Sequence, residues 1–174
     1  MKKQLRNIFA VLTVASSIAA TAQSRYDDPI FTNAQITVTN DVIYGANMAL
    51  SLTGGNPALQ DLKMDVYQPS QSVDTEQNRP LILVLHTGNF LPSIFSGSPT
   101  GSRKDSSIVQ ACREFAKRGY VAAAVTYRIG WAPTSGEEDV RRGTLLQAVY
   151  RAILDVKTCV RFMRKEKATN SNPY

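Results

Sequence analysis

Residues whose side chains could perform chemistry are few in this chain of 174 residues. The sequence contains one histidine, His86, and two cysteines, Cys112 and Cys159. A structural zinc site takes four nitrogen or sulfur ligands, and these three residues are too few to supply them. The serines of the loop after His86 have no partner base and are not expected to be nucleophiles; they are Ser96, Ser98 and Ser102. We expect no metal and no cofactor.

The segment of greatest chemical interest follows an apolar run and reads His86-Thr87-Gly88-Asn89-Phe90. A second segment, Tyr127-Arg128, follows another apolar run. Loops at the carboxyl ends of parallel strands carry the ligand sites of open α/β sheets. The two segments are therefore the expected location of a functional site, provided that both runs are parallel strands.

Four stretches have the patterns of strands. Alternation of apolar and polar residues over 35–39 predicts a half-buried strand that continues over 42–45 after a turn. A second alternating strand ends at Pro69. The continuous apolar runs 81–85 and 121–125 predict strands that are buried on both faces.

Two amphipathic helices are predicted. The first follows Asp105 or Ser106, either of which can cap it, and stops at Gly119. Its apolar stripe is Ile108, Val109, Cys112, Phe115 and Ala116. The second runs from about Glu138 to Lys167, and Arg151 and Asp155 are spaced to pair on its flank. Its predicted core stripe is Leu145, Val149, Ala152, Ile153, Val156, Val160 and Met163.

The order of these elements predicts a three-layer α/β/α sandwich. Buried strands joined by a helix imply parallel pairing, and a reversal between the two crossovers places the helices on opposite faces of the sheet. Cys112 and Cys159 then lie on opposite faces, so we do not expect a disulfide between them. The apolar stripe of the long helix should lead into a further central strand.

The segment from His86 to Phe90 resembles the His-Gly-Gly-Gly-Phe loop of the α/β-hydrolase superfamily, in its carboxylesterase-like esterase/lipase branch. The stretches 62–69, 115–130 and 152–162 are similar to the segments that flank this loop in that branch. The resemblance covers residues 35–174 and depends on the order of the pieces. It implies that residues 23–174 are the N-terminal part of an α/β-hydrolase domain, with the C-terminal part missing.

The resemblance also implies roles for individual residues. The backbone N–H groups of Gly88 and Asn89 would form part of an oxyanion hole for a carboxylic ester, such as an acylated carbohydrate or a lipid. His86 and Thr87 would support this loop, with His86 positioning it and not serving as the catalytic base. Tyr127 and Arg128 would anchor the neighbouring strand end by packing and hydrogen bonds. Trp131 has two open interpretations, a substrate-pocket wall or a core or rim aromatic.

The sequence departs from the family pattern in two ways. Thr87 and Asn89 stand where the family has glycines, although Gly88 and Asn89 still have N–H groups. No Gly-x-Ser-x-Gly motif is present, and the family order of serine, acid and histidine places all three beyond the segments that this chain contains. We therefore expect this chain to be inactive alone, because it lacks the nucleophilic serine and the histidine that would take its proton.

The N-terminus has the features of an export signal. Lys2, Lys3 and Arg6 precede an apolar stretch, and residues 20–22 form a small-residue cleavage site, so 1–22 is predicted to be a signal peptide. Its removal lowers the basic count from 20 to 17 against 14 acidic residues, a balance of +3. We expect a periplasmic or extracellular protein with no further membrane span and no nucleic-acid partner.

Two other classes of function remain open from the sequence. A secreted, non-catalytic binding or interaction protein could retain half of a hydrolase fold. Such a protein would expose a long apolar sheet edge, which invites aggregation. A nucleotide-binding α/β domain fits less well, because it needs a Gly-rich turn directly between a strand and a helix. In this sequence a long loop separates Gly88 from the next helix.

Overall fold

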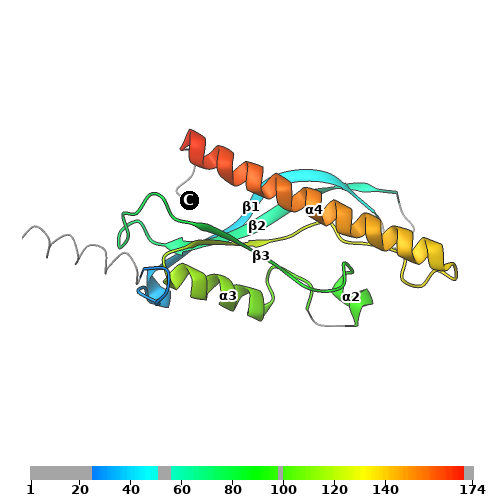
Figure 1. The fold of residues 1–174 in the computed structure, drawn as a ribbon, viewed down its shortest axis with the longest axis horizontal. Coiled ribbons are helices and arrows are strands. Elements are labelled where there is room, and N and C mark those ends of the chain that lie inside the picture. Colours follow the sequence, from blue (N-terminus) through cyan, green and yellow to red (C-terminus); the bar gives the residue numbers. More distant parts are fainter. Residues whose placement is uncertain (1–24, 51–55, 98–99, 171–174) are drawn as a thin grey trace, which may run out of the picture.

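A four-stranded mixed sheet lies at the centre of the computed structural model, which describes residues 25–50, 56–97 and 100–170 (Figure 1). The predicted signal peptide falls outside these described residues. The spatial order of the strands is β1-β2-β4-β3. Their bounds are Ile36–Ala49 for β1, Ala58–Pro69 for β2, Leu81–Leu85 for β3 and Val121–Val125 for β4. β1, β2 and β4 pair antiparallel, whereas β3 pairs parallel with β4, as the strand–helix–strand order predicts.

β1 is one long strand and not two strands joined by a turn. The register with β2 shifts between Thr39 and Val42, where Asp41 adopts a positive φ of 57°. An extra residue in one strand of an antiparallel pair forms a bulge, which bends the strand without ending the ladder. The expected turn at 40–41 is therefore wrong, because the chain absorbs the two polar residues as a bulge.

β4 is buried on both faces, as predicted, but β3 is not. All five residues of β4 are buried, and three of them are alanines, whose small side chains let elements pack closely on either face. β3 has only one neighbour in the described sheet, so it forms an edge. Leu81 and Leu85 are 37% and 42% exposed. The apolar run that predicted a central strand thus lies on a sheet edge.

Helices α3 (Ser106–Lys117) and α4 (Glu138–Thr169) lie on opposite faces of the sheet, with the sheet between them in Figure 1. Cys112 and Ala116 of α3 pack with Ala122 and Ala124 on one face. On the other face, α4 contributes Cys159 and Met163 to a cluster with residues from β1, β2 and β4. Both cysteines are buried as free thiols, so the expectation of no disulfide is confirmed. Two short helices, η1 (Asn33–Gln35) and α2 (Ser93–Ser96), complete the described elements.

The buried face of α4 differs from the predicted stripe. The residues that it buries are Ala148, Ala152, Asp155, Cys159, Met163 and Glu166. Ile153, predicted to be core, is 48% exposed, and Leu146 and Tyr150 beside it are more exposed still. α4 is therefore apolar on two sides, of which the described residues cover one.

Candidate functional site

The segment 86–91 directly follows β3 at its carboxyl end, and residues 126–131 follow β4 beside it. His86 is buried, and its ring stacks on Tyr127 with centroids 4.4 Å apart and planes at 7°. The Phe90 ring also contacts Tyr127, at 5.9 Å between centroids. These ring contacts pack the segment after β3 against the segment after β4.

Every backbone carbonyl from His86 to Phe90 accepts a hydrogen bond from within the chain. The donors to the carbonyls of residues 86, 87, 88, 89 and 90 are, respectively, the Tyr127 hydroxyl (2.7 Å), His86 Nδ1 (2.7 Å), Leu91 N–H (2.9 Å), Trp131 Nε1 (2.8 Å) and Gly130 N–H (2.7 Å). Five consecutive peptide groups are thus held in a single orientation. The imidazole of His86 is engaged in this arrangement, which agrees with a supporting role for it.

Three consecutive residues of this segment have left-handed backbone. φ is 111° at Gly88, 54° at Asn89 and 57° at Phe90. Asparagine tolerates this conformation, but a phenylalanine there is an outlier that costs of order 1–3 kcal/mol. Such strain persists only where the surrounding contacts impose it, and it concentrates at functional sites.

The N–H groups of the same three residues have no acceptor among the described part of the chain. With their carbonyls held by other donors, the free dipoles of Gly88, Asn89 and Phe90 are fixed. Successive N–H groups in a turn conformation form a concavity that binds anions. The arrangement can hold an oxyanion without the backbone having to rearrange. The prediction from sequence named Gly88 and Asn89 and missed Phe90, whose φ no pattern of residue types reveals.

Gly88 requires the absence of a side chain. A Cβ built on it would lie 2.9 Å from Cα of Gly101, which is closer than real Cβ atoms approach a backbone atom. Gly101 lies on the far part of the same loop, shortly before α3. The loop therefore folds back on itself, and its two glycines touch.

Asp105 shapes this return of the loop and does not cap α3 with its side chain. Asp105 is the N-cap residue, but its carboxylate accepts from the N–H groups of Gly101 (2.8 Å) and Ser102 (3.0 Å). The expectation that this carboxylate accepts from the first turn of α3 is wrong, because it accepts from N–H groups of the preceding loop instead.

Arg128 is anchored by a buried ion pair to α4. Its guanidinium donates to both carboxylate oxygens of Asp155, with Nη2 at 2.7 Å from Oδ1, and its backbone N–H donates to Oδ2 at 2.9 Å. Nη1 also donates to the carbonyl of Met48 at 3.1 Å. The predicted pair between Arg151 and Asp155 is wrong. Arg151 donates instead to the carbonyl of Gly130.

The other polar side chains of the loops act locally. Ser96 donates to the carbonyl of Ser93, and the Ser102 hydroxyl accepts from the N–H of Lys104. Ser98 lies outside the described residues. Trp131 lies at the rim of the segment 86–91, where its indole holds Asn89. No serine of the described loops is placed as an activated nucleophile.

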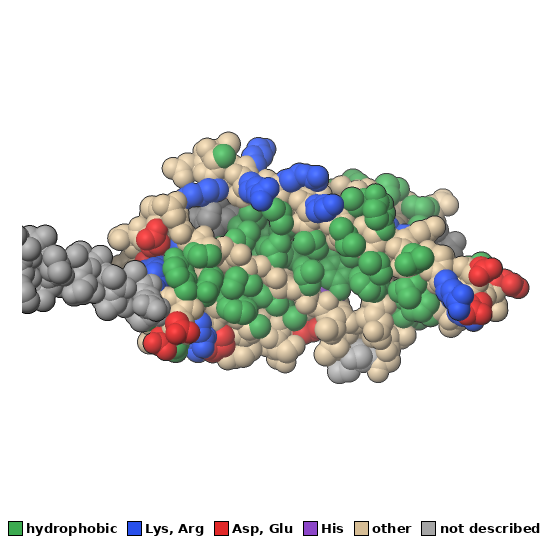
Figure 2. Space-filling model, in the orientation of Figure 1, with side chains coloured by type: hydrophobic (Ala, Val, Ile, Leu, Met, Phe, Trp, Pro, Cys, Tyr) green, Lys and Arg blue, Asp and Glu red, His purple; other side chains and the backbone are tan. Residues whose placement is uncertain are grey.

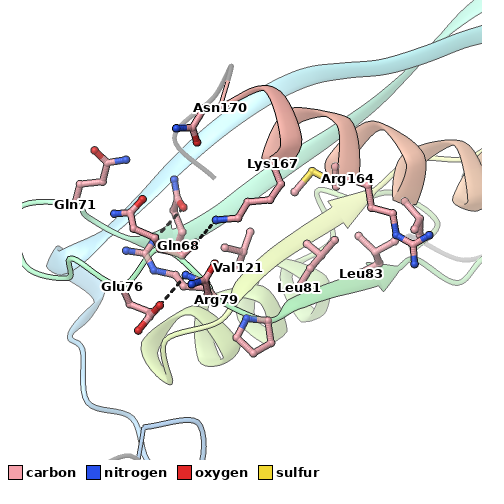
Figure 3. Close-up of a pocket in the computed structure, with 15 residues that line it drawn as sticks. Gln68, Gln71, Glu76, Arg79, Leu81, Leu83, Val121, Arg164, Lys167 and Asn170 are labelled. Atoms are coloured by element: carbon pink, nitrogen blue, oxygen red, sulfur yellow. Dashed lines mark hydrogen bonds between the residues drawn. The ribbon is translucent and has the colours of Figure 1, made fainter.

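A groove of about 940 Å³ lies at the opposite end of β3, beneath the C-terminal part of α4 (Figure 3). Leu81, Leu83 and Met163 contribute to its apolar floor. Arg164 and Lys167 of α4 lie at its rim, where Lys167 Nζ donates to the carbonyl of Gln77 at 2.5 Å. The groove is separate from the segment 86–91, and its described lining holds no constellation of catalytic side chains.

Within the described ranges, no three His, Cys, Asp or Glu residues gather as metal ligands. No described helix is long and apolar enough to cross a membrane. Comparison with protein-family models, with curated proteins and with solved structures finds no match to this chain. The fold is a mixed α/β arrangement, and its own geometry must support any assignment of function.

Proposed function

We propose that this chain is the N-terminal part of an exported carboxylic-ester hydrolase with an α/β-hydrolase fold. The observation that carries the proposal is the segment 86–90, with its carbonyls bound and the N–H groups of Gly88, Asn89 and Phe90 free among the described residues. In acyl transfer, such donors stabilise the negative oxygen that forms when a nucleophile attacks the ester carbonyl. The chemistry also needs a serine and a base, which the complete protein would supply.

The edge position of β3 supports a larger sheet. Val121 donates to the carbonyl of Pro80 at 3.0 Å, so in this parallel register Leu81, Leu83 and Leu85 direct their backbone groups away from β4. No described residue pairs with that side of β3. An apolar, unpaired edge is a liability that proteins cover.

The course of α4 supports a strand at the same edge. The contact of Lys167 with Gln77 places the end of α4 beside the start of β3. Asn170 ends the helix in the left-handed conformation, with φ of 53°. A strand that continued from there along β3 would run parallel to it and would cover Leu81 and Leu85. In the proposed enzyme, the nucleophile follows that strand.

The exposed apolar surface favours this larger fold over a complete, non-catalytic binding protein. Figure 2 shows hydrophobic side chains gathered along the face between α3 and α4, where the edge of β3 lies. Scattered apolar residues are normal on a surface, but a contiguous patch marks an interface. We propose that the remainder of the hydrolase fold covers this patch.

The test is to express the complete open reading frame that contains this chain. We expect the encoded protein to hydrolyse p-nitrophenyl acetate and to be labelled covalently by a fluorophosphonate, which reacts with activated serines. The 174-residue chain should show neither property. A complete protein that hydrolyses no short-chain ester and takes no label would refute the proposal, and hydrolysis by the 174-residue chain would refute the need for a later nucleophile.

A further inference from the structure

A buried carboxylate lies on β2, which β4 separates from the strand that leads into the segment 86–90. Asp65 of β2 is fully buried, although it belongs to a strand whose pattern predicts a polar, outward position. Lys104 Nζ lies 2.9 Å and Arg103 Nε 3.2 Å from its Oδ2. The backbone N–H of Asp41, at the bulge of β1, donates to its Oδ1 at 2.9 Å.

Arg103 extends this contact to two more elements. Its Nη1 donates to the hydroxyl of Thr126 at 3.0 Å, directly after β4. Its Nη2 pairs with the carboxylate of Asp41. We call Asp41, Asp65, Arg103, Lys104 and Thr126 the Asp65 cluster. It joins the bulge of β1, the middle of β2 and the end of β4 to a single loop.

That loop is the one that returns to the segment 86–90. Arg103 and Lys104 immediately follow Gly101 and Ser102, whose N–H groups are held by Asp105. Gly101 in turn lies against Gly88 with no room for a Cβ between them. A continuous series of contacts thus runs from the buried carboxylate to the first of the free N–H groups.

We propose that the Asp65 cluster is a positioning device, which presses residues 101–105 against Gly88 and so fixes the direction of the N–H groups of 88–90. The proposal deepens the proposed function, on which it rests for the identity of what those N–H groups bind. Asp65 and Arg103 are positioning residues, because the polar partners of both lie outside the segment 86–90.

The buried charges of the Asp65 cluster favour a role in positioning the loop over a role in stabilising the fold. Burial of an ion pair has a desolvation cost for each ion, and a well-packed apolar replacement is often as stable. Ion pairs and hydrogen bonds do, however, hold groups at defined distances and angles, which apolar contacts do not. A loop without regular structure gains a fixed position from such contacts.

The cluster can be tested by hydrogen exchange of assigned backbone amides in the 174-residue chain. The amides of Gly101 and Leu91 report the loop, since they donate to Asp105 and Gly88. Ala123 in β4 reports global opening. The variant Asp65→Asn/Arg103→Gln removes both charges together and leaves no buried charge unpaired. We expect exchange of Gly101 and Leu91 to accelerate by about tenfold or more, with Ala123 changed by less than about threefold.

Arg142→Gln is the matched control, because Arg142 is an exposed arginine of α4 whose partner is Glu138. It should leave all three amides unchanged. Unchanged exchange of Gly101 and Leu91 in the double variant would overturn the proposal. Equal acceleration of all three amides would also overturn it, because the cluster would then serve stability alone.

The same double variant separates this inference from the proposed function. In the complete protein, we expect kcat for p-nitrophenyl acetate to fall by about 10² while KM stays within about threefold, as loss of a transition-state contact requires. If the complete protein has no esterase activity but loop exchange accelerates, the positioning role stands and only the proposed function fails.

Discussion

At the scale of single residues, the buried ion pair of Arg128 and Asp155 joins the candidate site to α4. Sequence spacing suggested a surface pair within the helix. In the structure Asp155 instead pairs with Arg128, which lies in the segment directly after β4. Spacing along one helix cannot reveal a partner that another element brings.

Asp155→Asn is expected to destabilise the chain by about 3–5 kcal/mol, since it leaves the buried guanidinium of Arg128 without its counter-charge. Asp139→Asn, at an exposed position in the first turn of the same helix, should change stability by no more than about 0.5 kcal/mol. Urea unfolding of both variants measures the difference. Equal effects would show that the ion pair between Arg128 and Asp155 does not stabilise the folded chain.

The acid stability of the chain should depend on Asp65. Burial alone would raise the pKa of this carboxyl, but the Asp41 N–H, Lys104 and Arg103 outweigh burial and hold its pKa below the usual value. A depressed folded-state pKa contributes stability above the unfolded value of about 3.9, and this contribution is lost as the pH falls through the folded value.

The free energy of unfolding should therefore fall more steeply between neutral and acid pH in the wild type than in Asp65→Asn. The two curves should converge at the acid end, where the wild-type carboxyl is protonated. Parallel curves across the range would contradict the assigned charge state of Asp65.

At the scale of elements, β4 and the two long helices follow from the sequence, while the loops do not. The continuous apolar run predicted β4, and the apolar stripes at helical spacing predicted α3 and α4. The expectation that β3 is buried on both faces was wrong, because an apolar run indicates burial of its side chains but not the number of neighbouring strands. The contact of Gly88 with Gly101 joins two parts of a loop, and no local pattern encodes it.

The packing of the two helices buries both cysteines. Burial raises the pKa of both Cys112 and Cys159 to about 12, so neither thiol is ionised at physiological pH. We expect neither to react with a thiol reagent at mildly alkaline pH in the folded chain, and both to react in concentrated guanidinium. Rapid labelling of either thiol in the folded chain would contradict the packing of its helix.

Over the molecule as a whole, exposed apolar side chains gather on the side formed by β3 and the outer face of α4. The edge of β3 and the outer face of α4 expose leucine, isoleucine and tyrosine side chains together, whereas the β1 edge belongs to a long hairpin. In the proposed enzyme, this side is interior. The 174-residue chain should therefore associate through it.

Leu81→Lys/Leu85→Lys should reduce this association, since charged residues on an edge oppose strand pairing. Leu59→Lys/Met48→Lys is the control, which changes two exposed apolar residues of the β1–β2 hairpin. Sedimentation velocity over a range of concentrations measures the effect. If the control pair reduces association as strongly as the β3 pair, the β3 edge is not the associating surface.

In the proposed enzyme the N–H groups at 88–90 hold the oxyanion of an ester, and two glycines of one loop test this role. Gly88→Ala brings a Cβ to 2.9 Å from Gly101, whereas Gly97→Ala meets nothing within 4 Å although Gly97 also has a positive φ. The measurement is kcat for p-nitrophenyl acetate in the complete protein. We predict that Gly88→Ala lowers kcat by about 10² and that Gly97→Ala changes it by less than about threefold. Equal kcat values for the two variants would show that the geometry at Gly88 does not contribute to catalysis.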